Sequence, residues 1–552
     1  MDRRISRGRL RGVRLPLLLI LLLGVAIRVY WVAHEIPLLQ GEECEYSRLA
    51  QNLVQTHRYV GMREGPQLLY PPLFATLLGA GYLVTGHAEV ATHGVPLVAG
   101  LLLILAVFAL ARLNYGPRVG LIAAALTACY PLLTALSGAA ISESVYLPLI
   151  VGGAYFGLRC LDGSHRAAAV ACGACFGLAY LTRPEALVCP FIISGVALLE
   201  GRRRGLKPAV LTALLVLVPV VVLAAPYVAY LSSHAGGFRL EGKSAMNYTI
   251  GLRRNAGMSY PEAARGLGPD LREDGPQLLA NAFVATARYG APLRDFVPYF
   301  LASAHRNADE MFQTLVRSPA FGSIFTLMLV TVALLRRPWS RRRLVRETVL
   351  LAIGLGHVFT LLAAHFVQPR YVVPLLPLLI VWAAKGIDET ARWVAATVQR
   401  IGGGRSAPSA WAATGARAAL ILVLLLISVR GLTWAGFRDE IPDKVSLKQA
   451  GIWLDRYRPG PKRIMSVAIE VPYYAKGSLL PFPYAPAARA LEYVQVKKPD
   501  FLVLTGAQAS VGPYIHDWYE RGIPDASARE IYRAGRPGDY DVVIYEWKQA
   551  SR

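Results

Sequence analysis

The chain has 552 residues, 54% of them hydrophobic, and a formal net charge of +23. Apolar runs of about 17 to 25 residues, each able to cross the membrane as a helix, recur from Leu15 to about Gly436 and exclude a single soluble domain. The positive charge does not indicate nucleic-acid binding, because the basic residues lie between apolar runs rather than on one surface with aromatic side chains. We therefore expect a polytopic membrane protein whose partner is the lipid bilayer, with no nucleic acid.

Three arginine-rich segments set the expected topology. "MDRRISRGRLRGVR" precedes the first apolar run, "GRRRGLK" begins at Gly201, and "RRPWSRRRLVR" begins at Arg336. By the positive-inside rule, all three are cytoplasmic. With these anchors we expect about eleven spans, at residues 15–33, 89–112, 118–137, 143–160, 167–181, 186–200, 208–231, 319–335, 348–366, 371–386 and 418–436.

An odd number of spans places the two ends of the chain on opposite sides of the membrane. We expect a multi-pass protein of the inner (cytoplasmic) membrane with a cytoplasmic N-terminus. The external loops 34–88 and 232–318 then share the extracytoplasmic side with the C-terminal part. The expected domains are a transmembrane module, residues 1–436, and an extracytoplasmic domain, residues 437–552.

The first external loop carries a dense group of carboxylates. Its stretch "LQGEECEYSRLAQNL" contains Glu42, Glu43 and Glu45 directly after the first span. We expect Glu45 to be a solvated neighbour of the other two. The apolar segment 70–86 that follows is short and opens with two prolines, so we expect a helix at the membrane interface rather than a span.

Further ionisable residues gather at the outer ends of later spans. They are Glu143 in "SGAAISESVYL", Arg183 and Glu185 in "LTRPEAL", Lys243 in "LEGKSAMNY", and Arg370 in "HFVQPRYVVPLLPLL". Because ionisable groups are costly in hydrocarbon, this placement suggests function. A carboxylate can accept the proton of an attacking hydroxyl, while arginine and lysine hold an anionic phosphate leaving group.

The C-terminal part has the pattern of a small α/β module. The segments "RIMSVAI", "FLVLTG" and "DVVIYEW" read as strands bounded by proline and glycine. No catalytic constellation is visible in it, so we expect an accessory or acceptor-recognition role.

Five motifs carry a resemblance to a known family. "GEECEYSRLAQNL", "YPPLFATLLGAGYLVTG", "ISESVYLPL", "LAYLTRPEAL" and "QPRYVVPLLPLL" occur in the order and spacing of the GT-C membrane glycosyltransferases. Over residues 10–390 the chain most resembles the branch that includes protein O-mannosyltransferases and the lipid A aminoarabinose transferase. The resemblance implies a mainly α, GT-C type helical bundle with a small C-terminal α/β domain.

The resemblance also implies a function and a site. The function is transfer of a hexosyl or pentosyl group, with inversion, from a polyprenyl-phosphate donor to an extracytoplasmic glycolipid, polysaccharide or protein. Family members carry an Asp-Glu pair in the first external loop, with a tyrosine four positions after the Asp. Glu42 takes the Asp position, which implies the general base or acceptor-orienting carboxylate, and Glu43 is its rival. The expected catalytic residues are Glu42, Glu43 and Glu143, and the expected substrate-binding residues are Tyr46, Arg183, Glu185, Lys243 and Arg370.

Alternatives remain for these residues. Glu143 fits a helix N-terminus, Arg183 and Glu185 fit a mutual ion pair, and Arg370 fits an arginine that reaches from a span end to the interface. We expect no cofactor and no metal, although histidines near the glutamates leave a divalent cation possible. A lipid or sugar transporter or flippase is the alternative function, but neither an internal repeat nor mid-membrane polar residues support it. A catalytically inactive scaffold is a third.

Overall fold

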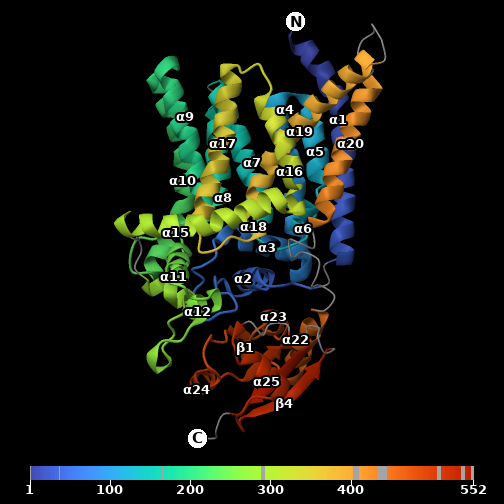
Figure 1. The fold of residues 1–552 in the computed structure, drawn as a ribbon. Coiled ribbons are helices and arrows are strands. Elements are labelled where there is room, and N and C mark those ends of the chain that lie inside the picture. Colours follow the sequence, from blue (N-terminus) through green and yellow to red (C-terminus); the bar gives the residue numbers. More distant parts are fainter. Residues whose placement is uncertain are drawn as a thin grey trace.

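The computed structural model describes residues 2–35, 38–163, 166–287, 293–401, 410–431, 444–506, 511–535 and 541–548. The chain forms an upright bundle of helices, a layer of shorter helices at one end of it, and a C-terminal domain beyond that layer (Figure 1). The N-terminus lies at the opposite end of the bundle. We call the end that carries the shorter helices the site end.

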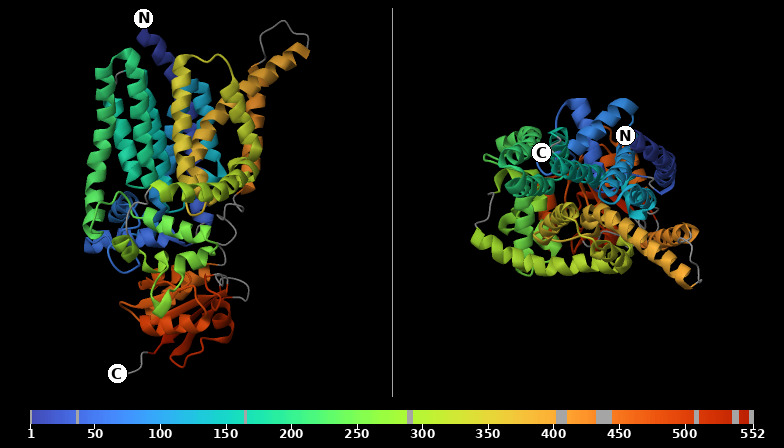
Figure 2. Two further views of the ribbon diagram at one scale, coloured as in Figure 1. Left: turned by 60° about the vertical axis from the view of Figure 1, so that its left-hand side comes forward. Right: turned by 90° about the horizontal axis from the view of Figure 1, so that it is seen from above.

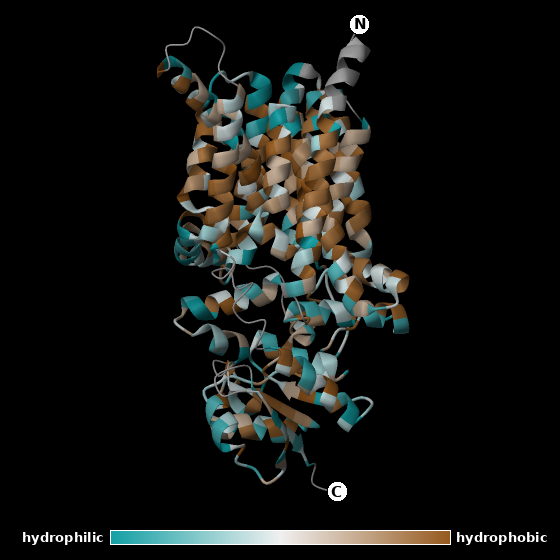
Figure 3. Cartoon of the chain, turned by 90° about the vertical axis from the view of Figure 1, so that its right-hand side faces the viewer, coloured by the Kyte–Doolittle hydropathy of each residue, from teal (hydrophilic) through white to brown (hydrophobic). Residues whose placement is uncertain are grey.

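Each of the predicted spans overlaps a helix of the bundle. These helices are α1 (Asp2–Glu35), α4 (Ala88–Tyr115), α5 (Pro117–Cys129), α7 (Glu143–Asp162), α8 (Arg166–Tyr180), α9 (Val188–Arg204), α10 (Leu206–His234), α16 (Ser323–Leu335), α17 (Arg341–Leu362), α19 (Leu376–Ile401) and α20 (Ala410–Val429). The span predicted at 118–137 is divided between α5 and α6 (Pro131–Leu136), and residues 432–436 of the last span lie outside the described residues. Figure 3 shows hydrophobic residues concentrated in this bundle, as a multi-pass membrane protein requires.

Helix length and composition support fewer spans than the sequence pattern does. Within the described residues, 8 helices are long and apolar enough to cross a membrane, or up to 9 if the pair Arg294–Arg317 and Pro319–Leu335, bent by 65°, is one span. Helices α5 and α8 are apolar but shorter, with 13 and 15 residues. Helix α5 ends where it does because Pro131 follows closely and disfavours helix before it.

The arginine-rich segments share one end of the molecule. The N-terminal part of α1 and the connections α9–α10 and α16–α17 all lie opposite the C-terminal domain (Figures 1 and 2). Residues from the two loops predicted to be external lie at the site end instead. The structure therefore separates the two groups of loops as the topology predicted.

The layer at the site end is built mainly from those two loops. It contains α2 (Glu42–Thr56), α3 (Pro72–Thr85), α6 (Pro131–Leu136), α11 (Ser244–Asn255), α12 (Tyr260–Arg265), α13 (Pro276–Leu279), α14 (Asn281–Thr286), α15 (Leu293–Phe312) and α18 (Pro369–Val372). Helix α3 is the helix predicted at 70–86, and it lies below the bundle beside α2 (Figure 1). Helix α15 runs across the end of the bundle.

The C-terminal domain is the predicted α/β module. Its five-stranded sheet has the order β2-β1-β3-β5-β4, with parallel pairs β1–β2 and β1–β3 and antiparallel pairs β3–β5 and β4–β5. The elements are α22 (Val445–Tyr457), β1 (Arg463–Ser466), α23 (Glu470–Tyr474), β2 (Ser478–Leu480), α24 (Ala487–Lys497), β3 (Phe501–Thr505), α25 (Ile515–Arg521), β4 (Ala528–Ala534) and β5 (Val542–Trp547). The predicted domain boundary at 436/437 lies outside the described residues.

One buried arginine of the bundle was not singled out from the sequence. Arg28 of α1 is 0% exposed, and its guanidinium donates to the carbonyls of Thr127 (3.1 Å) and Ala128 (2.8 Å) and to the Ser137 hydroxyl (3.0 Å). The carbonyl of Thr127 has no helical partner, because the residue four positions on is Pro131, which lacks an N–H. Arg28 therefore satisfies the carbonyls exposed by the break between α5 and α6.

Replacing this arginine should destabilise the bundle. Arg28→Met keeps most of the apolar stem but leaves buried carbonyls unsatisfied, at about 1–3 kcal/mol each. We expect a lower thermal unfolding temperature in detergent, with a smaller loss for Arg28→Lys. Arg14→Met, at an exposed position of the same helix, is the control. Equal unfolding temperatures for Arg28→Met and the control would contradict this role.

Candidate functional site

Glu42 meets Arg370 at the site end of the bundle. Glu42 is the first residue of α2, where a carboxylate is favoured by the helix dipole. Arg370 is the second residue of α18, whose first turn is set by Pro369. The two guanidinium nitrogens Nη2 and Nη1 lie 3.2 and 3.4 Å from Glu42 Oε1 and Oε2. Residues 328 positions apart thus form an ion pair whose two contacts are both long.

Accessibility separates the predicted carboxylates. The Glu42 side chain is 28% exposed and that of Arg370 is 26% exposed. Glu43, Glu45 and Glu143 are 6%, 4% and 1% exposed. Of the acidic residues predicted to be catalytic, Glu42 is the one that a substrate can reach in this conformation.

Glu43 is held by the backbone. Its Oε2 accepts from the N–H of Gln40 at 2.9 Å, and its Oε1 accepts from the N–H of Ala140 at 2.8 Å. Burial nevertheless raises the pKa of Glu43 to about 7. Its catalytic role stays a prediction, whereas the geometry assigns it the task of joining the segment before α2 to the segment before α7.

The expectation for Glu45 is wrong. Glu45 is buried, and its two oxygens accept from the side-chain amide of Gln67 (2.8 Å) and from the N–H of Met62 (3.1 Å). It is therefore not a solvated neighbour but an anchor for the loop between α2 and α3. No sequence pattern signals these contacts, because both partners lie in a segment without periodicity.

Lys243 brings a second positive charge to the site. It is the residue before α11, and its Nζ lies 4.2 Å from the ring centroid of Tyr70. Burial, and after it the charges of Arg183 and Arg370, lower the pKa of Lys243. Within the part of the chain that the structure describes, no carboxylate forms an ion pair with its ammonium group. The charge of Lys243 is thus available to an anionic ligand.

Arg183 lies between two carboxylates. Its Nη1 is 2.6 Å from Glu143 Oε1, and its Nε is 2.7 Å from Glu185 Oε1. The ion pair between Arg183 and Glu185 is therefore present. Glu143 is the first residue of α7, which agrees with the alternative that it stabilises a helix N-terminus. Roles of the three in binding or catalysis stay predictions.

Tyr46 is a buried residue of α2, the helix that begins with Glu42. It is 2% exposed and packs edge to face against Tyr70 and Phe74, at centroid distances of 5.0 and 4.8 Å. One helical turn separates it from Glu42, so both belong to one face of α2. Contact between Tyr46 and a substrate stays a prediction, and its visible contribution is to fix the position of α2.

The charges around Glu42 decide its protonation state. Burial raises the pKa of Glu42, but the charges of Arg370, Lys243 and Arg183 and the hydrogen bond from Arg370 outweigh it and lower the pKa to about 2. Beside these cations Glu42 is therefore ionised at neutral pH, and it is a weak base.

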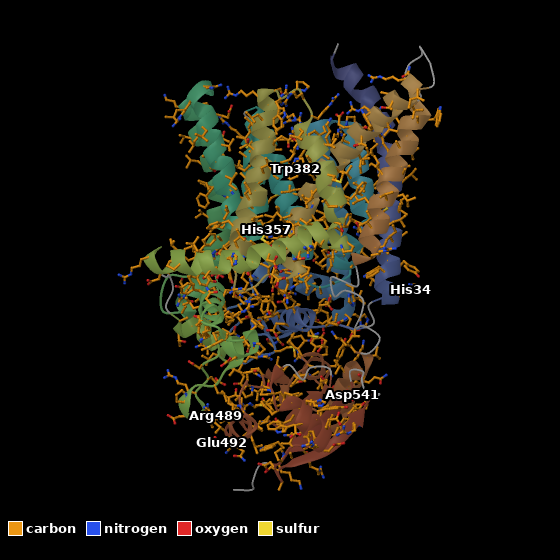
Figure 4. All side chains as sticks on the ribbon, in the orientation of Figure 1. His34, His357, Trp382, Arg489, Glu492 and Asp541 are labelled. Carbon is orange, nitrogen blue, oxygen red and sulfur yellow. The ribbon has the colours of Figure 1, made fainter. Side chains whose placement is uncertain are left out.

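A pocket enters the bundle beside the charged residues. It is small, with room for about one water molecule, and is lined by Glu185 and His357 among mostly apolar residues of α7, α9, α17 and the turn before α19. His357, which Figure 4 labels within the bundle, places Nε2 2.8 Å from the carbonyl oxygen of Tyr371.

Metal ligands are not grouped in the described residues. No set of three or more histidine, cysteine, aspartate or glutamate side chains there is arranged to hold an ion. Of the histidines near the glutamates, His93 places Nδ1 2.9 Å from the carbonyl of Gly138, and His57 and His87 are exposed helix-end residues.

Comparisons with known proteins agree with this fold. Residues 70–230 match the family model described as dolichyl-phosphate-mannose-protein mannosyltransferase. No curated protein sequence matches the chain. The structure is similar to ArnT from Cupriavidus metallidurans bound to undecaprenyl phosphate, at 15% identity over 98% of each chain and a TM-score of 0.55. It is also similar to the archaeal oligosaccharyltransferase AglB from Archaeoglobus fulgidus with an inhibitory peptide and a dolichol-phosphate, at 14% identity over 98% of this chain and 74% of that one, with a TM-score of 0.60.

Proposed function

We propose, from the premise that this chain has the GT-C fold of membrane glycosyltransferases, that it transfers a sugar from a polyprenyl-phosphate donor to an extracytoplasmic acceptor. The observation that carries the proposal is the accessible carboxylate of Glu42 beside the cations of Arg370 and Lys243. The ligands named for the two similar structures, undecaprenyl phosphate and dolichol-phosphate, support a lipid-linked donor. The acceptor is a glycolipid, a polysaccharide or a protein.

The reaction is a displacement at the anomeric carbon. The acceptor hydroxyl gives its proton to Glu42 as its oxygen forms the new bond to carbon, and the bond from that carbon to the phosphate oxygen breaks with its electron pair. The phosphate leaves as a stable anion beside Arg370 and Lys243, so no second acid is needed, unlike in glycoside hydrolysis. Attack opposite the leaving group inverts the configuration.

The orientation in the membrane follows from the same arrangement. The arginine-rich ends of the helices would face the cytoplasm, and the site end with its C-terminal domain would face outward. Such an orientation in the inner membrane presents the site to a donor at the outer surface. The segregation of the two loop classes in Figure 1 supports it.

A reconstituted enzyme tests the proposal against transport. Proteoliposomes containing the full chain and a labelled polyprenyl-phosphate sugar should form glycosylated product and free polyprenyl phosphate in equal amounts. A flippase would move the donor between leaflets without releasing the lipid phosphate. Movement without release would reject the glycosyltransferase in favour of the transporter.

The reaction should proceed without a divalent cation. Arg370 and Lys243 supply the positive charge that a metal would otherwise bring to the leaving phosphate. EDTA cannot remove these positive groups, because they are side chains of the protein. We therefore expect the transfer rate in proteoliposomes to stay within about twofold after treatment with excess EDTA. Loss of activity that added Mn²⁺ or Mg²⁺ restores would contradict this.

The pH dependence should reveal how donor binding changes the base. In the free site Glu42 has a pKa of about 2 because the nearby cations favour its charged form. A bound phosphate offsets those cations, so the pKa of Glu42 rises and it becomes a better base. As pH falls, kcat should decline at a higher pH than kcat/KM, which reports the free enzyme. If kcat and kcat/KM declined at the same acidic pH, donor binding would not change the pKa of Glu42, which would contradict this prediction.

A further inference from the structure

The segment that enters α2 is fixed by side chains at three successive backbone N–H groups. The N–H of Leu39 donates to the Tyr474 hydroxyl (2.9 Å), that of Gln40 to Glu43 (2.9 Å), and that of Gly41 to Glu470 Oε1 (3.1 Å). Two of these three acceptors belong to α23 of the C-terminal domain. The next residue in the chain is Glu42.

Gly41 makes these contacts informative. Its φ of 51° and ψ of −122° lie in a region that residues with a side chain rarely adopt. Among the described residues, no other group lies within 4 Å of the place that a Cβ would take, so the need for glycine comes from the backbone conformation. The glycine is thus needed for the backbone turn that aims the first residue of α2. Glu470 binds the N–H of that very turn.

The rest of α23 is docked along α2. The Tyr473 hydroxyl lies 2.8 Å from the Ser47 hydroxyl and accepts from the Gln51 amide at 2.9 Å, and Arg48 donates to the Tyr473 carbonyl at 2.8 Å. An apolar cluster formed by Leu39, Cys44, Met62, Tyr473 and Leu479 fills the contact. The domain therefore constrains the direction of α2 as well as its first turn.

Glu470 is a costly residue to place at such a contact. It is 4% exposed, and its second oxygen Oε2 has no hydrogen-bond partner among the described groups. A buried carboxylate is retained only where its interactions offset desolvation. Here it accepts from the N–H of Gly41 at the N-terminus of α2, where the helix dipole favours a negative charge.

We propose that the C-terminal domain positions the reacting carboxylate, with Glu470 and Tyr474 as positioning residues for Glu42. The inference rests on the proposed function and extends the accessory role expected of the domain. A shift of about 1 Å in a reacting group can reduce a rate about 100-fold. Release of the Gly41 N–H is therefore sufficient to impair the base without touching the donor site.

Steady-state kinetics of the full chain test the proposal. Glu470→Ala should lower kcat about 10- to 100-fold with the KM for the lipid donor unchanged. Glu470→Gln, which keeps an acceptor oxygen, should recover most of the rate, and Tyr474→Phe, which removes one hydroxyl, should show a smaller loss. Glu64→Ala is the matched control, because it removes the 3.1 Å contact with Arg463 between the same domain and a different loop.

A double variant separates positioning from general stability. Once Glu42→Gln has removed the base, adding Glu470→Ala should lower the residual rate no further, whereas damage to the fold would add to it. Wild-type kcat in both Glu470→Ala and Tyr474→Phe, or additive losses, would overturn this inference. If Glu42→Gln is inactive and the Glu470 variants are fully active, the positioning role of the domain is rejected while the proposed function stands. If Glu42→Gln is active, Glu42 is rejected as the base.

Discussion

Glu42→Gln should reduce sugar transfer by about 10²- to 10⁴-fold, the usual contribution of a general base. The amide cannot take up the proton of the acceptor hydroxyl, although it keeps the size of the side chain. Since Glu42 is paired only loosely with Arg370 and is 28% exposed, we expect little change in the unfolding temperature. Initial rates with a saturating labelled donor provide the measurement.

Two further variants make the result specific. Glu42→Asp keeps a carboxylate on a side chain one methylene shorter and should retain measurable transfer. Glu43→Gln should act mainly on stability. The two oxygens of Glu43 accept from the N–H groups of Gln40 and Ala140. In glutamine one of these oxygens becomes an NH₂ donor, which would face one of the two N–H groups. A folded Glu43→Gln with no transfer, beside an active Glu42→Gln, would make Glu43 the base.

The sequence predicted the parts of the site that membrane physics makes conspicuous. Charged residues at the ends of apolar spans stand out, so Glu42, Arg183, Lys243 and Arg370 could be identified and assigned to one side. Their topology then brought them together at the site end. The long apolar runs likewise located the helices of the bundle, because lipid permits few alternatives.

The remainder depended on contacts between distant segments. Nothing local distinguishes Glu42, reachable and paired with Arg370, from the buried Glu45, whose partners lie in an irregular loop. The strands β2, which is three residues long, and β4, in which no residue is fully buried, were missed because neither has a buried alternating pattern. The role of Glu470 depends on how two domains dock, which no local pattern encodes.

Arg370→Gln should be the most damaging change on the phosphate side of the site. Removing a preorganised donor to a developing anion costs about 10²- to 10³-fold in rate. The change also removes the nearest positive charge from Glu42 and so raises the pKa of that carboxylate. We expect weaker binding of polyprenyl phosphate, measured directly with labelled lipid, together with a lower kcat. Arg370→Lys keeps the charge but loses the two-nitrogen contact, so its lipid binding and kcat should lie between those of the wild type and of Arg370→Gln.

The control for this variant is an ion pair in the same layer whose arginine is about as exposed as Arg370. Arg253 is 23% exposed and its Nη2 lies 3.4 Å from Asp274, so Arg253→Gln removes a comparable charge away from Glu42. If Arg370 only reached from the end of its span to the membrane interface, Arg370→Gln and Arg253→Gln would both leave lipid binding intact. Arg370→Lys would then have no effect on lipid binding or kcat. Suppose instead that Arg370→Gln loses phosphate binding, that Arg253→Gln does not, and that Arg370→Lys partly restores it. This result assigns the guanidinium of Arg370 to the leaving phosphate, because in that position its charge acts on both the departing anion and the base Glu42.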